Sequence, residues 1–571
     1  MTVPWRMLLF ASACLCGGTS GASVRTEGTS DRYLDIMEQA VRAYSDEHQE
    51  RYLSDVERNG VQEHGFPRLT ANLAVLVANG RLPEKRAILQ RMMTAACRDA
   101  AKGKMPPKSG GNDFTVKELS IALRELTAKG TYPAEVLARW RDDLKRVRAE
   151  TCYSVVPPVG ADRSYNWCVF GAASEQARLA MGYGGDPAFV ERYVADQTRW
   201  FDENGMYRDP GQPAVYDLVT RLQFALILQY GYDGPSRGRL EALMDRSAAP
   251  TLRMLSACGE IPYGGRSNQF LHNHTFYSAL CEWYARRFAA RGDCMTAGRF
   301  KTAAARSLQA LEAWLAVRPV RHVKNRYPAD SGIGCEKYAY FDKYMATMGS
   351  WAMLARECRM NGIEPVECQT DGVFQTSPDF HWVFLQAGDY SAQFDYQANP
   401  HYDCTGLGRL HRRGAPPQIC LSTPCAKRPA YAVTGKDRVD LAIVPVVGRD
   451  VKMALAKTEE AVGRARVDWR LGDLSWRCIL SSTGLEMVLA GADEVKLTLP
   501  VLAFDGEREA QVRTDGRNVS VSYCGWVCTY ATDGVVRDTG AVAENRNGRY
   551  RRFEAAGSRS LKVLVTIARG E

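Results

Sequence analysis

The chain has two parts in which hydrophobic residues recur with different periods. From about Asp31 to Asn361, apolar residues recur every three or four positions, the spacing that places them on one face of an α-helix. Connectors containing glycine and proline separate these stretches; in one of them Asp186 is suited to cap a helix that Pro187 opens. The pattern predicts twelve helices, at residues 34–44, 69–78, 85–101, 116–128, 134–151, 167–181, 187–201, 216–230, 237–256, 268–290, 297–317 and 338–359.

Twelve helices joined by short connectors pack as antiparallel pairs. We therefore expect residues 31–361 to form an (α/α) toroid of about six helical hairpins. Aromatic and polar residues gather where the helices begin, as a central cleft requires. This distribution favours a closed toroid over an open helical solenoid.

After residue 369 the period becomes that of short strands. Runs rich in β-branched and aromatic residues, separated by Gly, Asp and Asn turns, predict an antiparallel β-sandwich over residues 372–571. We place the boundary in the segment 361–371, NGIEPVECQTD. The predicted strands are 373–376, 381–386, 390–396, 431–434, 439–446, 485–489, 495–499, 519–523 and 561–567.

Length and charge agree with this division and exclude some functions. A chain of 571 residues is too long for one compact core. The net charge of +9 is spread along the chain, without a basic block or a DNA-reading cysteine–histidine spacing, so we expect no nucleic-acid partner. A mild basic excess suits a polyanionic substrate, although it is equally common on proteins that have none.

The N-terminus has the features of a secretion signal. Arg6 precedes an apolar run at residues 7–16, which small residues follow up to Ala22. The run is too short to span a bilayer, and no later stretch is apolar enough to do so. We expect residues 1–22 to be a signal peptide and the mature protein to be secreted or periplasmic, without an integral membrane segment. Attachment as a lipoprotein through Cys14 is the alternative, but the bulky aliphatic residue usual three positions earlier is missing.

The chain contains 17 cysteines, two of them in the signal segment. In an oxidising compartment, the close pairs Cys420 with Cys425 and Cys524 with Cys528 are candidate disulfides. Others, such as Cys168 and Cys281, lie in helical patterns and are expected to be small buried side chains. No CxxC pair is present, so a structural zinc site has little support.

The segment 261–280, IPYGGRSNQFLHNHTFYSAL, contains the chain's most distinctive polar residues. A glycine turn leads through Arg266 and Asn268 into a helical pattern in which Asn273 and His274 are adjacent, with His272 beside them. An amide next to an imidazole can stabilise an oxyanion while a proton is removed beside a carboxylate. The alternative is that both side chains are hydrogen-bonded inside a helix packing layer.

At this point the chain resembles the alginate lyase and heparinase II/III families of secreted polysaccharide lyases, which also have a toroid followed by a β-sandwich. Residues 272–277, His-Asn-His-Thr-Phe-Tyr, are similar to the Asn-Asn-His-x-Tyr-Trp helix signature of toroidal alginate lyases. The resemblance implies that Asn273 neutralises a uronate carboxylate and that His274 acts as the base or assists. His272 replaces the first amide, Phe276 stands at the tyrosine position and Tyr277 at the tryptophan position.

β-Elimination explains why such residues are needed. The proton on C5 of a uronic acid becomes acidic only when the neighbouring carboxylate is neutralised by hydrogen-bond donors or cations. A base then removes that proton, and an acid, often a tyrosine, protonates the leaving glycosidic oxygen.

A second constellation, residues 334–344, supplies candidates for the acid. On a helix, Lys337, Tyr340 and Tyr344 fall at i, i+3 and i+7 and share one face. That face would offer a cation and two phenols to an anionic sugar, with Glu336 beside it. We expect Tyr340 or Tyr344 to be the acid; the alternative is a tyrosine-rich packing stripe.

Further segments are expected to form cleft walls. Trp167 and the group Arg208, Asp217 and Arg221 lie at helix entrances, where a core tryptophan and a structural ion pair are the alternatives. Arg409 and His411 lie in a glycine-punctuated basic segment, for which a surface turn is the alternative. The predicted substrate-binding residues are Arg266, Asn268, His272, Tyr277, Lys337, Glu336, Arg208, Asp217, Arg221, Trp167, Arg409 and His411.

Two other functions fit the same architecture. A uronate-directed glycoside hydrolase would use paired carboxylates, for which Asp217, Glu336, Asp342 and Asp403 are available. A non-catalytic glycan-binding protein would keep the aromatic and cationic residues without needing a base. The expected function is β-elimination on an acidic polysaccharide or oligosaccharide. It needs no cofactor, and a role for a structural or assisting divalent cation is left open.

Overall fold

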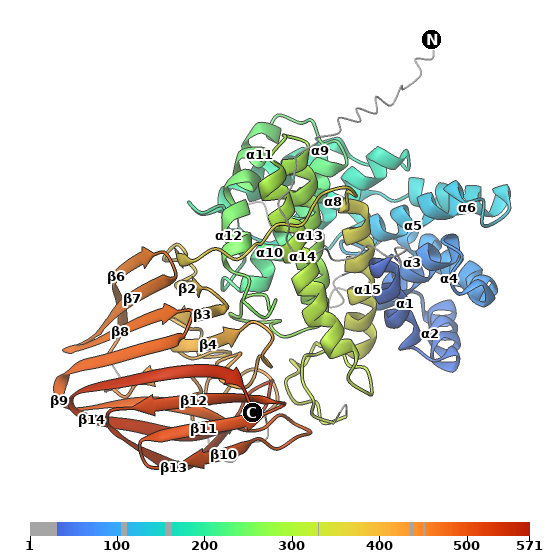
Figure 1. Cartoon of the computed structure of the whole chain (residues 1–571). Coiled ribbons are helices and arrows are strands. Elements are labelled where there is room, and N and C mark those ends of the chain that lie inside the picture. Colours follow the sequence, from blue (N-terminus) through green and yellow to red (C-terminus); the bar gives the residue numbers. More distant parts are fainter. Residues whose placement is uncertain are drawn as a thin grey trace.

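The computed structural model describes residues 31–103, 111–154, 163–328, 330–433, 439–448 and 451–570. The predicted signal peptide and Cys14 lie outside these residues and stay predictions. Helices fill the first part of the chain and strands fill the second, and the two parts pack against each other (Figure 1). The order predicted from the hydrophobic periods is therefore confirmed.

The observed helices lie at the predicted positions along the chain, but several differ from the predicted ones in length. Val116–Ala128 begins and ends as predicted, whereas 134–151 and 237–256 are each divided in two. Asp46–Asn59 was not predicted, because only Gln49, Leu53 and Val56 of its 14 residues are buried. The helices are α1 (Arg32–Arg42), α2 (Asp46–Asn59), α3 (Gly65–Ala78), α4 (Arg86–Lys102), α5 (Val116–Ala128), α6 (Ala134–Lys145), α7 (Ala149–Cys152), α8 (Asn166–Met181), α9 (Pro187–Gln197), α10 (Ala214–Gln229), α11 (Arg237–Arg246), α12 (Ala248–Arg253), α13 (His272–Ala289), α14 (Cys294–Leu315) and α15 (Phe341–Cys358).

Six helices form a closed inner ring. Helix α3 packs on α5, α5 on α8, α8 on α10, α10 on α13, α13 on α15, and α15 returns to α3. Helices α1, α4, α6, α9, α11 and α14 each pack against an inner helix from outside. Each of the inner helices α3, α5, α8, α10 and α13 thus pairs with the outer helix that follows it in the chain, and α15 pairs with α1, which confirms the toroid of about six hairpins.

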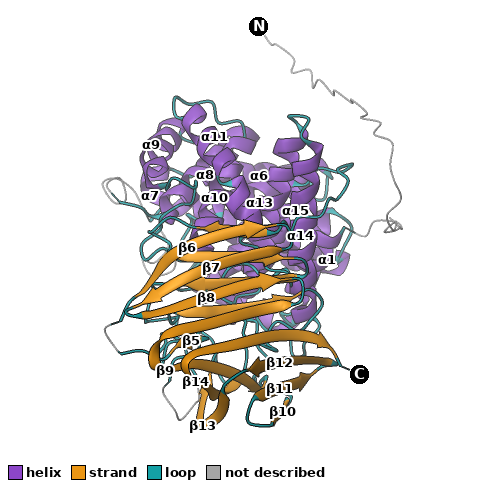
Figure 2. Cartoon of the chain, turned by 60° about the vertical axis from the view of Figure 1, so that its left-hand side comes forward, coloured by secondary structure: helices purple, strands orange, loops and turns teal. Residues whose placement is uncertain are grey.

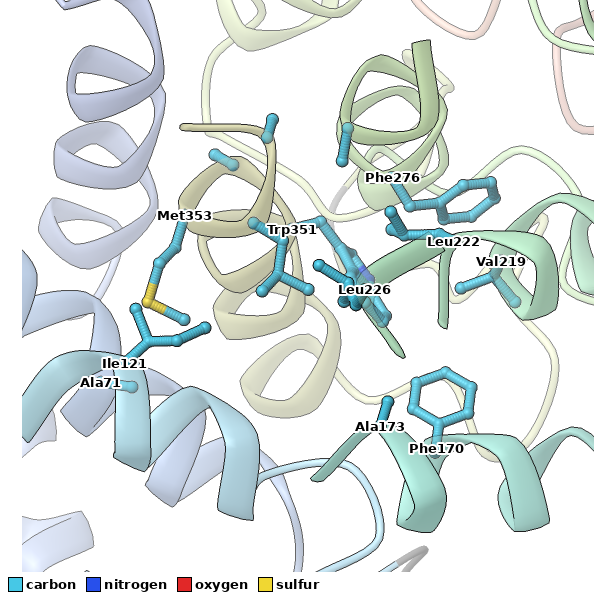
Figure 3. Close-up of a cluster of buried hydrophobic side chains, with 14 of the residues drawn as sticks. Ala71, Ile121, Phe170, Ala173, Val219, Leu222, Leu226, Phe276, Trp351 and Met353 are labelled. Carbon is cyan, nitrogen blue, oxygen red and sulfur yellow. The ribbon is translucent and has the colours of Figure 1, made fainter. Parts of the chain in front are cut away.

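Apolar side chains from all six inner helices meet inside the ring (Figure 3). Ala71 comes from α3, Ile121 from α5, Phe170 from α8, Leu222 from α10, and Trp351 from α15. Inner helices are consequently buried around most of their circumference, as the burial of all 14 residues of α3 shows. This packing fills the middle of the ring.

The strands form two antiparallel sheets. The smaller sheet has the order β1-β2-β3-β4, and the larger one runs β10-β11-β12-β14-β9-β8-β7-β6, with β13 paired to β14 and β5 to β9. The strands are β1 (Gly372–Gln375), β2 (Trp382–Ala387), β3 (Tyr390–Asp395), β4 (Gly406–Arg412), β5 (Val444–Pro445), β6 (Met453–Ala461), β7 (Arg464–Leu471), β8 (Leu474–Ser481), β9 (Gly484–Phe504), β10 (Gln511–Thr514), β11 (Asn518–Tyr523), β12 (Trp526–Thr532), β13 (Val535–Glu544) and β14 (Arg549–Arg569).

The small sheet lies between the helices and the large sheet (Figure 1), and strands β6, β7 and β8 of the large sheet lie side by side in Figure 2. Strands β1 to β3 contact β6, β7 and β8 on one side. On the other side, Gln386 donates to the Leu255 carbonyl at 3.0 Å and Gln393 donates to the Tyr263 carbonyl at 2.8 Å. Every residue of β2 and β3 is therefore buried, whereas strands of the large sheet alternate between buried and exposed positions.

Cysteine pairing differs from the prediction. The four cysteines Cys420, Cys425, Cys524 and Cys528 are free, as are the other cysteines among the described residues. Cys168 and Cys281 are fully buried among apolar neighbours, as expected for small core side chains. In the part of the chain that the structure describes, no helix is both long and apolar enough to cross a bilayer.

Candidate active site

A cavity of about 360 Å³ opens where all six inner helices begin. Its lining comes from the N-terminal parts of these helices and the residues just before them, so each helix N-terminus delivers one or more side chains. The apolar cluster in Figure 3 includes Phe170, Phe276 and Trp351, which also line the cavity and form its floor. The lining residues are His64, Arg68, Phe114, Tyr165, Asn166, Trp167, Phe170, Val215, Tyr216, Val219, Arg266, Ser267, His272, Asn273, Phe276, Tyr338, Lys343, Tyr344, Thr347 and Trp351.

A cluster of near-parallel rings forms one wall. The rings of Phe270, His272 and Tyr344 each lie 5.0–5.3 Å from the other two by centroids, with planes within 22° of parallel. The Nδ1 atom of His272 is buried without a hydrogen-bond partner among the described residues, which leaves Nε2 as the ring nitrogen able to serve a ligand. Burial first, and then the positive charge of Arg68, lower the pKa of His272 well below its usual range. The imidazole is therefore neutral near pH 7 and can accept a proton.

Tyr344, in contrast to the unprotonated His272 ring nitrogen, keeps its proton. Burial raises the pKa of its phenol well above the usual value, so the hydroxyl keeps its proton. A neutral imidazole and a protonated phenol thus lie side by side in one wall, and these are the protonation states that a general base and a general acid need before a reaction near neutral pH.

A second imidazole, His64, is held by an arginine. Arg68 places Nη1 3.2 Å from Nδ1 of His64 and 2.8 Å from the Thr347 hydroxyl. Because an arginine can only donate, Nδ1 of His64 accepts and its proton lies on Nε2. The charge of Arg68 is balanced by buried Glu118, whose Oε2 is 3.1 Å from Nε.

Arg266 is a partly exposed cation of the lining. Its guanidinium lies 4.5 Å from the centre of the Tyr216 ring and binds Asp209, with Nη2 to Oδ2 at 2.7 Å. Asp209 also accepts from the backbone and side-chain nitrogens of Asn166, each at 3.1 Å. Burial raises the pKa of Asp209 to about 6 despite these contacts. The carboxylate thereby fixes two cavity residues from behind.

Ser267 joins three more lining residues. Its hydroxyl is 2.9 Å from the Tyr216 hydroxyl and also contacts that of Tyr338, and its carbonyl accepts from Nδ2 of Asn273 at 3.0 Å. One hydrogen on Nδ2 remains free, and Oδ1 of Asn273 is buried without a partner among the described residues. Asn273 therefore has hydrogen-bonding capacity that the surrounding protein does not use.

Five residues predicted from sequence line this cavity. They are Asn273 and His272 from α13, Tyr344 from α15, Arg266 from the preceding turn, and Trp167 from α8. Trp167 packs edge-on against Phe114, with centroids 5.4 Å apart, while one side remains at the cavity.

His274 lies outside the cavity, on the other side of α13. Its Nδ1 is 2.9 Å from the Ser307 hydroxyl, and its Nε2 is 3.2 Å from Lys324 Nζ and 3.5 Å from Glu260 Oε2. All three partners are buried. One residue along a helix turns a side chain by about 100°, so His274 cannot share the direction of Asn273.

The predicted shared face of Lys337, Tyr340 and Tyr344 is not formed. Helix α15 begins at Phe341, and residues 335–340 form a turn that is anchored by Glu336. Tyr340 is 60% exposed and Lys337 is also exposed. Only Tyr344 of these three faces the cavity, joined there by Tyr338 and Lys343.

Asp217, Arg221 and Tyr277 are internal, whereas Arg208 is partly exposed. Arg221 and Asp217 form a fully buried ion pair at 2.6 Å, and Arg208 pairs with Asp379 at 3.0 Å outside the cavity lining. Tyr277 donates to the Thr251 carbonyl at 2.8 Å inside the helical core. The structural ion pair considered from sequence is thus what forms.

The basic segment of the β half is also internal. Arg409 and His411 lie on strand β4 rather than on a surface turn, and both are buried. Arg409 donates to the carbonyls of Ser422 and Ile261 at 2.8 and 2.7 Å, and His411 contacts the hydroxyl of Ser256 at 3.0 Å. These contacts bind the small sheet to the toroid and place neither residue at the cavity.

Asn268 and Glu336 stand behind the lining. Oε1 of Glu336 accepts from the backbone nitrogen of Ser267 at 2.9 Å, and Asn268 is buried in the same turn. Sequence reasoning missed His64, Arg68, Phe114, Phe170 and Trp351. The available signal was the segment His64-Gly65-Phe66-Pro67-Arg68, a polar entrance to a helix that is otherwise nearly all apolar.

The described residues contain no group of three or more His, Cys, Asp or Glu side chains arranged to hold an ion.

Comparisons with known proteins give only distant structural likenesses. No family model and no curated protein matches the chain. Among solved structures, heparan sulfate lyase HepC from Pedobacter heparinus matches with a TM-score of 0.35 and 10% identity, over 94% of this chain and 93% of that one. Chondroitinase AC lyase gives 0.39 and 7%, over 94% and 83%. A family 88 glycosyl hydrolase from Bacteroides vulgatus gives 0.38 and 12%, over 57% and 99%. At these scores the likenesses assign no activity to this chain.

Proposed function

We propose that the protein is an enzyme that cleaves a uronate-containing polysaccharide or oligosaccharide by β-elimination. The observation that carries this proposal is the composition of one cavity wall. A neutral imidazole, a protonated phenol and an amide with unused hydrogen-bonding capacity lie together, next to Arg266 and Lys343.

The cations and the amide would neutralise the substrate carboxylate. Arg266 and Lys343 reach the cavity from α13's preceding turn and from the first turn of α15. The free Nδ2 hydrogen of Asn273 adds a neutral hydrogen-bond donor to these two cations. Neutralising the carboxylate stabilises the enolate-like charge that develops when the C5 proton leaves.

His272 and Tyr344 would then move the protons. Nε2 of His272 accepts the C5 proton, the C4–O bond breaks as a C4=C5 double bond forms, and the Tyr344 hydroxyl protonates the departing oxygen. The imidazolium afterwards returns a proton to the phenolate, so the enzyme ends in its starting state. Tyr338, whose pKa burial also raises, lies 6.2 Å from Tyr344 by ring centroids and is the second candidate for the acid.

The deciding experiment measures near-ultraviolet absorbance during incubation with a panel of uronate-containing polymers. β-Elimination creates an unsaturated uronide that absorbs there. Absorbance should rise together with new chain ends in at least one polymer. Sugar binding without any cleavage across the panel would favour a glycan-binding protein and end the enzymatic proposal.

A hydrolase remains the second candidate because of Asp209. Burial raises the pKa of this carboxyl group to about 6, and it lies directly behind Arg266 and Asn166 of the lining, so it is the carboxyl group that a hydrolytic reaction would have to expose. Hydrolysis would release new chain ends without absorbance, and Asp209→Asn would abolish it. Elimination predicts instead that Asp209→Asn acts only through the loosened Arg266 and Asn166.

A further inference from the structure

A hairpin of the β-sandwich reaches the turn behind the cavity. Residues 545–548 connect β13 to β14, and Asn545 fixes their shape by accepting from the backbone nitrogens of Asn547 and Gly548 at 2.7 and 3.0 Å. The Asn545 side chain also donates to the Thr423 carbonyl at 2.7 Å, and Asn547 donates to the Lys324 carbonyl at 3.2 Å. The hairpin tip is thereby held in one conformation against the toroid.

Arg546 projects from this tip into the protein interior. It is 1% exposed, its guanidinium lies 3.9 Å from the centre of the Tyr431 ring, and it donates to the Asn268 carbonyl. It also makes a two-pronged contact with Glu336, with Nη2 to Oε1 at 2.7 Å and Nη1 to Oε2 at 3.3 Å. A planar guanidinium and a carboxylate joined at two points fix each other's orientation as well as each other's charge.

Glu336 transmits that orientation to the cavity. The same Oε1 that Arg546 binds accepts from the backbone nitrogen of Ser267 at 2.9 Å. Ser267 has φ of 59°, a conformation that residues other than glycine seldom adopt without surrounding support. Ser267 then contacts Tyr216, Tyr338 and Asn273 through its hydroxyl and carbonyl.

We propose that Arg546 is a positioning residue of the active site, which acts through Glu336 to hold Ser267 and, through Ser267, the cavity groups Asn273, Tyr216 and Tyr338. The β-sandwich is on this view part of the catalytic apparatus although it contributes no residue to the cavity lining. The kinetic consequence rests on the proposed β-elimination, whereas the structural link stands independently of the reaction.

The structural link is tested by hydrogen–deuterium exchange on the full-length protein. The Ser267 amide donates to a buried carboxylate and should exchange slowly in the wild type. Arg546→Lys retains the charge but loses the two-pronged geometry, and we expect faster exchange in peptides covering residues 264–271. Arg178→Lys is the matched control, because Arg178 is also buried and bound to a carboxylate, Glu175 at 2.6 Å, in helix α8. It should leave that peptide unchanged.

The kinetic consequence is tested with single and double variants on the polymer identified by the absorbance assay. We expect Arg546→Lys and Ser267→Ala each to lower kcat about tenfold with little change in KM. Misplaced reacting groups slow the chemical step more than they weaken substrate binding. Since both act through Ser267, the double variant should lose about tenfold rather than about a hundredfold.

The outcomes separate the two proposals. Unchanged exchange around Ser267 in Arg546→Lys, or full additivity of the two losses, would overturn the positioning role. A wild-type protein without turnover on any polymer overturns the proposed function, and the exchange measurement then still decides whether Arg546 controls Ser267.

Discussion

Two histidines two positions apart on α13 have different surroundings, and the difference defines their roles. His272 is a neutral imidazole at a cavity, stacked on a phenol, whereas His274 is enclosed by Ser307, Lys324 and Glu260. A residue proposed as a base, such as His272, must be accessible to the substrate. A buried ion cluster such as that around His274 is stable only when every charge in it has a partner. Substitutions at the two places should consequently fail in different ways.

The first prediction concerns the base. His272→Gln should lower kcat by at least about a hundredfold, since a positioned general base contributes roughly 10²–10⁴-fold. The thermal unfolding midpoint should fall only modestly, because Nδ1 of His272 has no hydrogen-bond partner among the described residues and glutamine loses only the ring contacts with Phe270 and Tyr344. His401→Gln is the control, as His401 is exposed in the β half. Turnover retained in His272→Gln would exclude His272 as the base.

The second prediction concerns the cluster around His274. Burial disfavours ionised Glu260, but the charges of Lys324 and His274 hold its pKa well below the usual range. Lys324→Met leaves that buried carboxylate uncompensated and should lower the free energy of unfolding by about 3–5 kcal/mol. Denaturation by urea measures the loss. The double variant Lys324→Met/Glu260→Gln should recover part of it, and an equally unstable double variant would show that the pairing is unimportant.

At the scale of elements, the closure of the ring depends on how closely α15 approaches α3. A Cβ on Gly349 would lie 2.4 Å from Nδ2 of Asn72, and that side chain is already engaged with the Ala346 carbonyl at 2.8 Å. Helices α3 and α15 can therefore pack this closely only because residue 349 of α15 has no side chain.

Gly349→Ala should accordingly destabilise the protein by about 1–3 kcal/mol, because overpacking outweighs the gain of up to about 1 kcal/mol in helix propensity. Gly238→Ala in α11 is the matched control, since Gly238 is exposed and a Cβ there meets nothing within 4 Å. It should be neutral or slightly stabilising in the same thermal unfolding measurement. A stabilising effect at Gly349 would mean that α3 and α15 can separate without cost.

The order of helices and strands could be predicted from the sequence because the spacing of hydrophobic residues differs between the two kinds of element. The direction in which individual side chains point could not be predicted. Helix α13 is buried on almost every side, so its pattern contains no polar face that would separate His272 and Asn273 from His274. Likewise, the sequence of α3 is almost entirely apolar, so it gave no reason to select Arg68 as a site residue. The charge of Arg68 is balanced by Glu118, which lies fifty positions later. Gly334 and the turn after it also gave no sign that α15 starts only at Phe341.

For the molecule as a whole, buried neutral histidines predict sensitivity to acid. Burial lowers the pKa of His64, His272 and His411 well below the ordinary value of about 6.5. Above that value both the folded and the unfolded chain are unprotonated at these sites, and the stability is fully present. As pH falls below it, the unfolded chain binds protons that the folded chain excludes, so stability is lost.

The thermal midpoint should therefore fall between about pH 7 and pH 5. His411→Gln is suited to test the cause, because glutamine can replace the contacts with Ser256 and Ser422 without titrating. Its midpoint should fall less steeply than that of the wild type. Identical slopes in the two proteins would remove His411 from the explanation.

The common direction of the six inner helices has an electrostatic consequence. Each helix carries a macrodipole equivalent to roughly half a positive charge at its N-terminus, and all six of these ends surround the same cavity. The backbone alone thus makes the cavity attractive to anions before Arg266 or Lys343 is counted. Such a field needs no particular side chain, so substitutions in the lining can change which anionic ligand the cavity selects while the preference for a negative charge persists.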